Sequence, residues 1–339
     1  MIHAVIMAGG SGTRFWPLST KNKPKQCLTF FSDKTLMEET IERLLPLFDK
    51  TNIHIATNEK LAKQMKEVLP KINYILEPCA KNTTGCIGLA CIEIIKADPD
   101  ALIFIETADH IYKDPNKYLE TVKLGIKLAE DNKIVAIGIK PSYAFTGFGY
   151  IQPGQAYKEG FLVESFREKP NKETAEKFLK KGFLWNSGMY IFKAKKMLEE
   201  LKKYEPEIYG HLINISNGAD KKEEFSKIRS IAIDYAVSER SKDLIVLKAD
   251  MHWDDIGSWD SLDRLKNKDK EGNIILGNHS NIDSNNNIIY SKKLVGTIGL
   301  KDFVIVETDK AILICPKDRA SDVGKLVKQL KEEGKKEFL

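Results

Sequence analysis

The segment on which the predicted fold depends stands at the start of the chain, MIHAVIMAGGSGTRFWPLSTKNKPKQ, residues 1–26. Ile2–Ala8 is mostly apolar and predicts a buried strand. A glycine-rich loop follows it directly, Ala8-Gly9-Gly10-Ser11-Gly12-Thr13-Arg14. Glycines let backbone N–H groups approach phosphate oxygens, and Arg14 adds a cation able to bind phosphate through two hydrogen bonds. The segment therefore indicates a phosphate-binding loop, although a plain tight turn is the alternative.

Two familiar phosphate motifs do not fit this loop. A Walker loop ends in GKS or GKT, whereas this one ends in GTR. The dinucleotide fingerprint needs a third glycine where Phe15 stands. Pro17 and Pro24 also prevent a helix from following the glycines immediately. We instead expect a basic loop that carries Arg14 and Lys25 to the nucleotide.

The first half of the chain alternates apolar strands with helical periodicity, which predicts a mostly parallel sheet covered on both faces. The expected strands are Ile2–Ala8, Ile53–Thr57, Tyr74–Glu77, Ala101–Thr107 and Ile134–Ile139. The expected helices are Leu36–Phe48, Lys60–Leu69, Thr84–Ala97 and Lys117–Glu130. Ligands of such sheets sit beyond the carboxyl ends of the strands, so the loops after Ala8, Glu77 and Thr107 are the candidate site.

The second half predicts a subdomain and then a small β module. Between Tyr150 and Leu265 we expect strands at Gly160–Phe166, Met189–Phe192 and Leu244–Leu247, with a helix at Glu173–Lys180. A charged linker, Lys266–Asn273, separates this part from short β runs with Asn-rich turns, which suggest coils of a β-helix. A helix over Ala320–Lys336 closes the chain. The predicted domains are residues 1–265 and 274–339.

The composition is that of an ordinary soluble globular protein, with 42% hydrophobic and 30% charged residues among 339. A net charge of +5 suits phosphorylated substrates and argues against a nucleic-acid binder. Since no apolar run reaches the ~20 residues of a membrane span, we expect no membrane association. The five cysteines form no CxxC pair, so neither a zinc site nor a disulfide framework is supported, and we expect a cytoplasmic location.

The run GGSGTRFWPLS…KPKQ resembles the signature of the sugar-1-phosphate nucleotidyltransferases, and among them the mannose-1-phosphate guanylyltransferases. The resemblance implies a Rossmann-like α/β fold of the nucleotide-diphospho-sugar transferase type. It also implies that Lys25 stabilises charge at the α-phosphate. The triphosphate would be held by Ala8, Gly9, Gly10, Gly12, Thr13 and Arg14.

Glu77-Pro78-Cys79-Ala80-Lys81-Asn82-Thr83 is similar to the EPxxRNT segment beside the guanine in this family, with Lys81 in place of arginine. The continuation TTGCI also departs from the usual TAPAI. A carboxylate that accepts from guanine N1–H and N2–H₂, with an amide at O6, is sensible base chemistry. The resemblance thus places Glu77, Asn82 and Thr83 on the nucleotide. The alternative, compatible with it, is a helix N-cap made by Asn82 or Thr83.

Two aspartates are expected to bind Mg²⁺. Asp109 follows the strand that ends at Thr107, and a carboxylate there is a suitable magnesium ligand. Asp255 lies in WDDIGSW, residues 253–259, which resembles the family's WxDxGSW; alignment selects it over Asp254. Taken alone, such an Asp pair is usually a solvated turn.

Four more motifs resemble the sugar side of the family's site, in the family's order. They are TGFGYI (146–151), FREKP (166–170), WNSGM (185–189) and IDYA (233–236). A hairpin turn, an exposed salt bridge and a core tryptophan are the alternatives for single motifs. The resemblance implies that the sugar phosphate is bound by Gly147, Gly149, Glu168, Lys169, Asn186, Asp234 and Asp255.

Leu294–Asp302 and Phe303–Glu307 look like the β-helical tail of the guanylyltransferases for mannose. The resemblance implies transfer of GMP from GTP to mannose 1-phosphate, with Mg²⁺, Arg14, Lys25 and Asp109 at the reacting phosphate. It also implies a homodimer. No isomerase activity is expected, because the sequence contains no cupin domain of the kind that carries it in bifunctional relatives. The alternatives are another sugar nucleotidyltransferase, using UTP or dTTP with glucose 1-phosphate, and a catalytically silent regulatory subunit.

Overall fold

The computed structural model describes residues 1–10 and 12–339; Ser11 of the glycine-rich loop lies outside the described residues. The chain divides into two compact units that alternate along the sequence. The first comprises Met1–Gly9, Ile41–Ala108 and Tyr112–His252, and the second Gly10–Thr40, Asp109–Ile111 and Trp253–Leu339. The sequential division into residues 1–265 and 274–339 stays a prediction.

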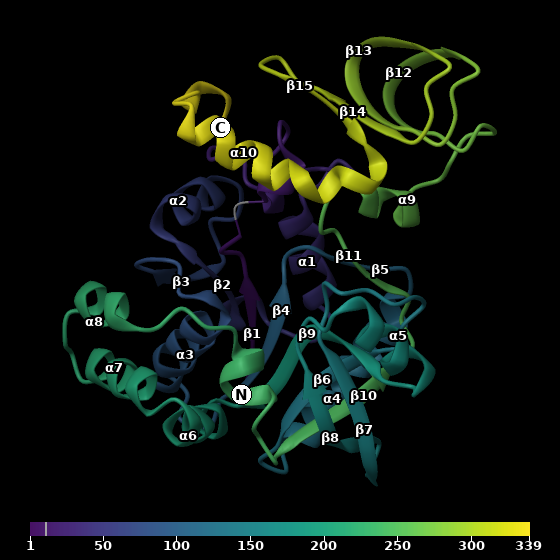
Figure 1. Ribbon diagram of the computed structural model, residues 1–339. Coiled ribbons are helices and arrows are strands. Elements are labelled where there is room, and N and C mark those ends of the chain that lie inside the picture. Colours follow the sequence, from purple (N-terminus) through teal and green to yellow (C-terminus); the bar gives the residue numbers. More distant parts are fainter. Residues whose placement is uncertain (11) are drawn as a thin grey trace. The chain divides into compact units, whose positions relative to one another are not determined.

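The first unit is built on a nine-stranded mixed sheet (Figure 1). In sheet order the strands are β3 (Asn73–Glu77), β2 (Ile53–Asn58), β1 (Ile2–Met7), β4 (Leu102–Thr107), β9 (Leu184–Lys193), β6 (Ile134–Ile139), β10 (Leu244–Ala249), β8 (Gly160–Arg167) and β7 (Tyr150–Tyr157). Strands β3, β2, β1 and β4 are mutually parallel, whereas β9 lies antiparallel between β4 and β6. The predicted Rossmann-like mixed sheet is confirmed, with β1 inside its parallel half.

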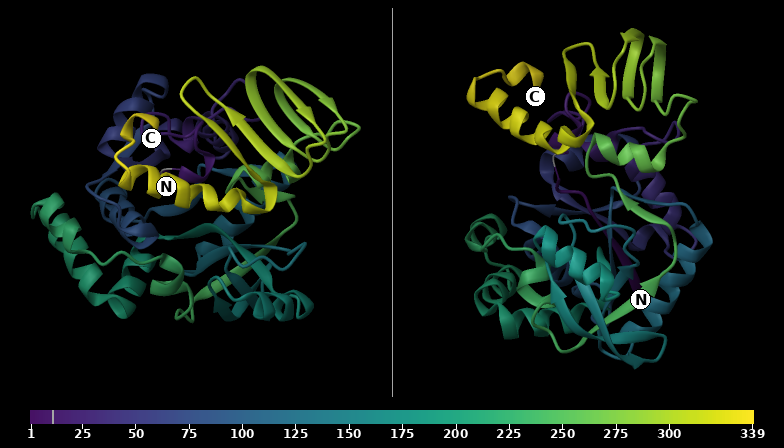
Figure 2. Two further views of the ribbon diagram at one scale, coloured as in Figure 1. Left: turned by 45° about the horizontal axis from the view of Figure 1, so that its top comes forward. Right: turned by 45° about the vertical axis from the view of Figure 1, so that its right-hand side comes forward.

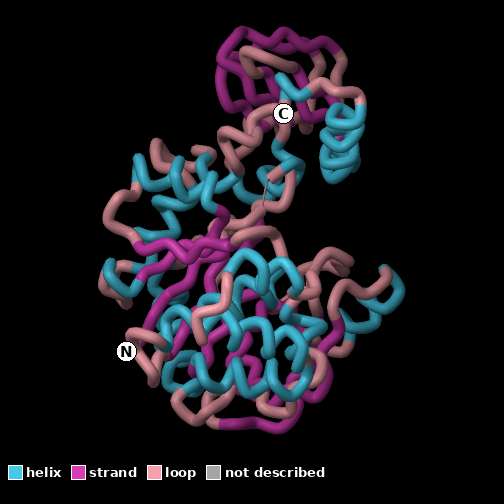
Figure 3. Tube along the Cα trace, turned by 90° about the vertical axis from the view of Figure 1, so that its left-hand side faces the viewer, coloured by secondary structure: helices cyan, strands magenta, loops and turns pink. Residues whose placement is uncertain are grey.

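Helices cover the sheet of the first unit on both faces (Figure 3). They are α2 (Glu59–Val68), α3 (Asn82–Ile95), α4 (Pro115–Ala129), α5 (Lys172–Lys180), α6 (Ala194–Tyr204), α7 (Pro206–Ser216) and α8 (Lys221–Lys227), and α1 (Leu36–Leu44) spans the boundary between the units. Strand β9 shows the two faces, because neighbouring side chains of a strand point in opposite directions. Tyr190 and Phe192 belong to the core that α3 and α6 complete. Ile191 instead fills the space beside Gly125 of α4, where a Cβ would lie 2.4 Å from its terminal methyl.

The structure differs from the expected elements mainly in the second half of this unit. The strand expected at Met189–Phe192 is the ten-residue β9, which includes the WNSGM motif. Pairing with β6 and β7 over that part of the strand supplies its backbone hydrogen bonds. Helix α1 ends at Leu44, four residues before the expected end. A short π-helix over Asp234–Ser238 has no counterpart in the sequence pattern.

The second unit contains the β module at the end of the chain. Its strands are β12 (Ile274–Ile282), β13 (Ile288–Ile298), β14 (Phe303–Glu307) and β15 (Ile312–Pro316). Strands β12, β13 and β14 are parallel and stack as coils (Figure 2). Ile274, Ile288 and Val304 are register partners on these strands and are buried. Buried Asn287 donates to Asn273 Oδ1 at 3.1 Å, and this ladder explains the Asn-rich turns. The expected β-helix-like module is confirmed.

The remaining elements of the second unit position its loops. Strand β11 (Trp253–Asp255) pairs with β5 (His110–Tyr112), and α9 (Leu262–Leu265) follows. The closing helix, expected over Ala320–Lys336, is shorter: α10 covers Val323–Glu332. One 3₁₀ segment precedes it, Lys317–Asp322, and another follows it, Lys336–Phe338. No helix of the described residues is long and apolar enough to cross a membrane. All five cysteines are free thiols.

Candidate active site

The glycine-rich loop begins where β1 ends, as expected. Ala8 is fully buried and fixes this end of the strand: its N–H donates to Ala56 O at 2.9 Å, and its C=O accepts from Thr57 Oγ1 at 3.0 Å. Gly9 and Gly10 follow in exposed positions. A Cβ at Gly10 would meet no neighbour within 4 Å, so the backbone there is open to a ligand on the side where a Cβ would point.

Gly12 is required by both conformation and space. Its φ of 63° lies in the left-handed region, which disfavours side chains. A Cβ there would also lie 2.4 Å from Lys25 Cβ and 2.9 Å from Ser19 Oγ. Thr13 and Arg14 continue as a 3₁₀ turn in which Arg14 is exposed. The close approach at Gly12 therefore brings the loop and Lys25 together.

Lys25 and the two predicted metal ligands form one cluster in the second unit. Only 7% of Lys25 is exposed, and its Nζ donates to Asp109 Oδ2 at 2.6 Å and lies 3.9 Å from Asp255 Oδ1. The Asp109 backbone accepts from Ile256 N–H at 3.0 Å, which ties the two aspartate segments together. Gly257 lies beside Arg14, with 3.7 Å between its Cβ position and Arg14 Nη1. The predicted Arg14, Lys25, Asp109 and Asp255 are thus neighbours.

The cluster has the character of a divalent-cation site. Oδ1 of Asp255 is buried and has no hydrogen-bond partner among the described residues. Burial, and next the charge of Asp109, raise the pKa of Asp255, while Lys25 opposes the rise. A buried carboxylate oxygen beside a second carboxylate fits a hard cation such as Mg²⁺, which prefers oxygen ligands. The neighbouring Asp254 forms an ion pair instead: Arg264 donates to both its carboxylate oxygens, at 2.7 and 2.8 Å.

That fit rests on two side chains. Among residues 1–10 and 12–339, no group of three or more His, Cys, Asp or Glu side chains could hold a metal ion. The remaining ligands would have to be phosphate oxygens and water, as is usual for Mg²⁺ in phosphoryl-transfer sites.

The predicted base-binding carboxylate lies at the end of β3 in the first unit. Glu77 is 8% exposed, and burial raises the pKa of its carboxyl to about 7, although the Cys86 thiol and Lys221 lower it. Its Oε2 lies 3.5 Å from the position of a Cβ at Gly9. The carboxyl therefore adjoins the first glycine of the loop in a poorly hydrated position.

Helix α3 begins five residues after this carboxylate, at Asn82. Lys81 occupies the N-cap position, and its side chain makes no capping hydrogen bond, so the alternative of an N-cap at Asn82 or Thr83 is wrong. Asn82, with a φ of 60°, accepts from Thr83 N–H at 2.8 Å through Oδ1. Thr83 Oγ1 accepts instead from Ile233 N–H at 2.8 Å, which connects the predicted base segment to the IDYA segment.

The sugar-side motifs also come together in the first unit. Glu168 is 7% exposed, and Lys169 pairs with it. A Cβ at Gly149 would lie 2.4 Å from Glu168 Oε2, so glycine leaves the room that this carboxylate occupies. Gly147 packs similarly against the Phe145 ring. Burial, and next the charge of Asp234, raise the pKa of Glu168.

Asn186 and Asp234 are linked by a residue that the sequence analysis missed. Asn186 Nδ2 donates to Asp234 Oδ1 at 2.8 Å and to the Tyr190 hydroxyl at 3.0 Å. Tyr190 is buried, donates to Asp234 Oδ1 at 2.9 Å and accepts from Ser238 Oγ at 3.1 Å. Asn186 and Tyr190 are four residues apart on β9 and therefore share one face. The sequence predicted this strand only from Met189, so it gave no signal that connects the two residues. The π-helix that starts at Asp234 places this carboxylate within reach.

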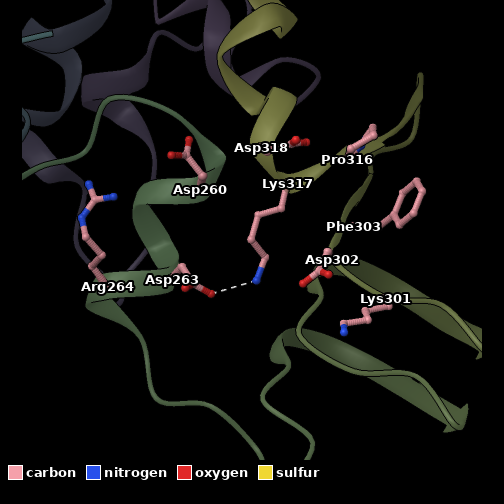
Figure 4. Close-up of a pocket in the computed structure, with 9 residues that line it drawn as sticks. All are labelled: Asp260, Asp263, Arg264, Lys301, Asp302, Phe303, Pro316, Lys317 and Asp318. Carbon is pink, nitrogen blue, oxygen red and sulfur yellow. Dashed lines mark hydrogen bonds and ion pairs between the residues drawn. The ribbon is translucent and has the colours of Figure 1, made fainter. Parts of the chain in front are cut away.

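A cavity elsewhere in the second unit contains none of the predicted site residues. It has a volume of about 520 Å³ and lies between α9 and the β module (Figure 4). Two of the three cations in its lining are paired: Lys317 donates to Asp263 Oδ1 at 2.9 Å, and Arg264 binds Asp254. Nothing in this lining points to a nucleotide.

Two family models match the chain in succession. The model described as nucleotidyl transferase matches residues 3–272. The model described as MannoseP isomerase/GMP-like beta-helix domain matches residues 277–330. Together they span both the sheet and the β module.

Curated relatives and solved structures agree with these matches. Mannose-1-phosphate guanylyltransferase 2 of Escherichia coli O157:H7 is 37% identical over the whole of this chain and 75% of its own length. Mannose-1-phosphate guanylyltransferase of Escherichia coli K12 is 37% identical over 99% of this chain and 75% of its own. A crystal structure described as mannose-1-phosphate geranyltransferase from Thermus thermophilus superposes with a TM-score of 0.92 and 32% identity, covering 97% of this chain and 99% of that one.

Proposed function

The chain belongs to the nucleotidyl transferase family, and from this premise we propose that it transfers GMP from GTP to mannose 1-phosphate, giving GDP-mannose and pyrophosphate. The observation that carries the proposal is the cluster of Lys25 with Asp109 and Asp255 beside the glycine-rich loop. A catalytically silent regulatory subunit would not need Lys25 or the two aspartates, so their presence favours an active enzyme. The full-length likeness to guanylyltransferases for mannose favours this reaction over those of UTP- or dTTP-dependent relatives.

The reaction needs positioning and charge stabilisation more than proton transfer. The phosphate of mannose 1-phosphate is largely a dianion at neutral pH and needs no general base to attack the α-phosphorus of GTP in line. Repulsion between the two phosphates is the main obstacle, and fixed cations lower it. Arg14 and Lys25 act on the nucleotide phosphates, and Lys169 acts on the sugar phosphate. Lys25 also donates to Asp109, so the phosphates and this carboxylate share its positive charge.

We propose Mg²⁺ as the cofactor, held by Asp109 and Asp255. The buried Oδ1 of Asp255, which accepts no hydrogen bond from the described residues, supports this assignment. When bound, the ion supplies positive charge at the phosphate oxygens. Lys25 meanwhile keeps the two carboxylates partly neutralised, because it lies 2.6 Å from one and 3.9 Å from the other.

The base and sugar are recognised by separate carboxylates. Glu77 accepts from guanine N1–H and N2–H₂, and Asn82 and Thr83 lie at the start of the adjoining helix. Glu168 and Asp234 accept from mannose hydroxyls, and Asn186 with Tyr190 fixes the direction of Asp234. Gly147 and Gly149 lie beside the hexose, and Gly149 leaves the room in which the Glu168 carboxylate reaches it.

The test is pyrophosphate release with mannose 1-phosphate, Mg²⁺ and GTP, ATP, UTP, dTTP or CTP in turn. Release with GTP alone supports the proposal. Release with another nucleotide contradicts the guanine assignment, and silence throughout favours a regulatory subunit. Lys25→Ala is expected to lower kcat by about 10²–10³, whereas Lys21→Ala, an exposed lysine of the same loop, is the matched control with normal turnover.

We also propose that the protein is a homodimer through its β module. Ile282 and Ile298 are register partners on β12 and β13, and Leu294 is four residues from Ile298, so all three lie on one face. Ile282 is 59% exposed, Ile298 78% and Leu294 71%. Such exposure is unusual for neighbouring large apolar side chains. A second copy of the same face would cover them. Light scattering should show a dimer that Leu294→Asp dissociates and Leu124→Asp, on α4, does not; a monomeric wild-type chain contradicts the proposal.

A cytoplasmic location is proposed on chemical grounds. All five cysteines are free, and reducing conditions keep thiols in that state. Recovery of the protein with a cytoplasmic marker after cell fractionation tests this, and recovery in a membrane or secreted fraction contradicts it.

A further inference from the structure

We infer that α10 and the segment after it hold Thr13 and Arg14, at the end of the glycine-rich loop, in their active conformation, so that Gly324 and Trp16 are positioning residues for Arg14. This inference rests on the proposed role of Arg14 at the triphosphate. It assigns a catalytic contribution to the end of the chain, which contributes none of the predicted site residues.

The first contact is made by the backbone of α10. Gly324 is the second residue of this helix, and a Cβ there would lie 3.6 Å from Arg14 Cγ and 3.6 Å from Thr13 Oγ1. These are ordinary contact distances, so a methyl group fits without displacement. A larger side chain would have to occupy the space of the Arg14 stem. The helix thus bounds Arg14 on one side.

The second contact is a pair of hydrogen bonds at Trp16, which follows the loop. The indole Nε1–H of Trp16 donates to Phe338 O at 2.7 Å, across 322 residues of sequence. The Trp16 carbonyl accepts from Trp259 Nε1–H at 3.3 Å. The residue two positions after Arg14 is therefore fastened through both its side chain and its carbonyl.

The third contact is a shared apolar core. Phe15, Trp16, Trp259, Ala320 and Val323 belong to one buried cluster of the second unit. The rings of Phe15 and Trp259 are 5.3 Å apart, edge to face. Arg14 itself is exposed while its two successors are buried, so the core anchors the loop and leaves the guanidinium accessible.

These contacts explain how an exposed arginine can be ready for a phosphate. A long side chain on a free loop loses conformational freedom when it binds, and prior ordering reduces that loss. A misplacement of about 1 Å at a catalytic group costs about 10²-fold in rate. A helix packed against the Arg14 stem limits such displacement. The closing helix therefore acts through Arg14 rather than on the substrate.

The direct test varies the side chain at position 324. Gly324→Ala should retain wild-type kinetics, because its methyl lies at contact distance. Gly324→Leu should lower kcat/KM for GTP about 10²-fold, with an unchanged KM for mannose 1-phosphate. Gly210→Leu is the matched control, since Gly210 also lies in a helix and no atom approaches its Cβ position within 4 Å. It should behave as wild type, and both leucine variants should unfold at similar temperatures.

Trp16→Phe provides a second test that does not depend on tolerance of a larger residue. It keeps an aromatic ring in the core and removes the indole N–H, so kcat/KM for GTP should fall about tenfold. The inference is overturned if Gly324→Leu shows the kinetics of Gly210→Leu, or if both variants raise the KM for the two substrates equally. Arg14→Ala separates the premises. If it turns over normally, the proposed role of Arg14 fails; if it is impaired while Gly324→Leu is normal, only the positioning role fails.

Discussion

Replacement of Glu77 by glutamine is expected to change the pH dependence of stability in a defined direction. Burial raises the pKa of this carboxyl to about 7 in the folded chain, against an ordinary 4.5 that applies to the unfolded chain. Between these values the unfolded chain has released the proton and the folded chain has not, so the wild-type free energy of unfolding falls as pH rises from 4.5 to about 7 and is level above. The total corresponds to about 3 kcal/mol. An amide in place of the carboxyl does not titrate in this range, and it removes the fall.

Urea unfolding of the wild type and of Glu77→Gln at pH 5, 6, 7 and 8 measures the effect. The stability of the variant minus that of the wild type should rise by up to about 3 kcal/mol over this range and then level off. A difference that is independent of pH would refute the reasoning that Glu77 is a poorly hydrated acid. Glu67→Gln, an exposed glutamate of α2, is the control and should give a flat difference.

The same carboxyl should make guanine recognition depend on pH. Only the ionised form accepts from both N1–H and N2–H₂, so GDP-mannose should bind the wild type more weakly as pH falls below 7, by about tenfold per pH unit. Its diphosphate carries no group that titrates in this range. Calorimetry with Glu77→Gln should show weak binding at every pH, and a pH-independent wild-type affinity would contradict the assignment of Glu77 to the base.

Three further outcomes are expected. Tyr190→Phe should raise the KM for mannose 1-phosphate about tenfold, because Asp234 loses one donor, while steady-state assays show an unchanged KM for GTP; an equal change in both would contradict its place on the sugar side. Lys196→Met should lower the free energy of unfolding by about 3–5 kcal/mol in urea titrations, since it leaves the buried Glu200 without its cation at 2.8 Å; a change below about 1 kcal/mol counts against that estimate. EDTA should stop pyrophosphate release and Mg²⁺ restore it, and undiminished release in EDTA would exclude a metal requirement.

The sequence predicted the parallel half of the sheet because each strand is an apolar run with a helix after it. Strand β1 is flanked by β2 and β4 and is buried on both faces, so local composition carries the signal. Strand β9 was harder, since Asn186, Ser187 and Gly188 interrupt its apolar pattern. Its conformation depends on pairing with strands from elsewhere in the chain, which a local pattern does not contain.

The residues of the candidate site also fall into two groups, those that a sequence motif identifies and those that only tertiary contacts identify. Residues with a motif of their own, such as Gly12 and Asp109, could be selected from the sequence, and the structure supplies a reason for each. Tyr190 and Gly324 could not, because their importance comes from a partner rather than from a pattern. Tyr190 lies in an ordinary apolar strand, and Gly324 lies in an amphipathic helix at the opposite end of the sequence from Arg14. Contacts over such separations are fixed by tertiary packing alone.

The ionic contacts of Lys25 give the site a further property. A nearly buried lysine needs a partner before substrate arrives, and Asp109 provides it at 2.6 Å. The same pair prevents Asp109 and Asp255 from facing each other without a cation. Removal of Lys25 should therefore have two consequences: loss of charge at the α-phosphate, and stronger repulsion between the two carboxylates. The second consequence should favour binding of a divalent cation, so that Lys25→Ala binds Mn²⁺ more tightly than the wild type while turning over more slowly. Tighter metal binding with slower turnover distinguishes a lysine that serves the transferred phosphate from one that serves only to neutralise the aspartates.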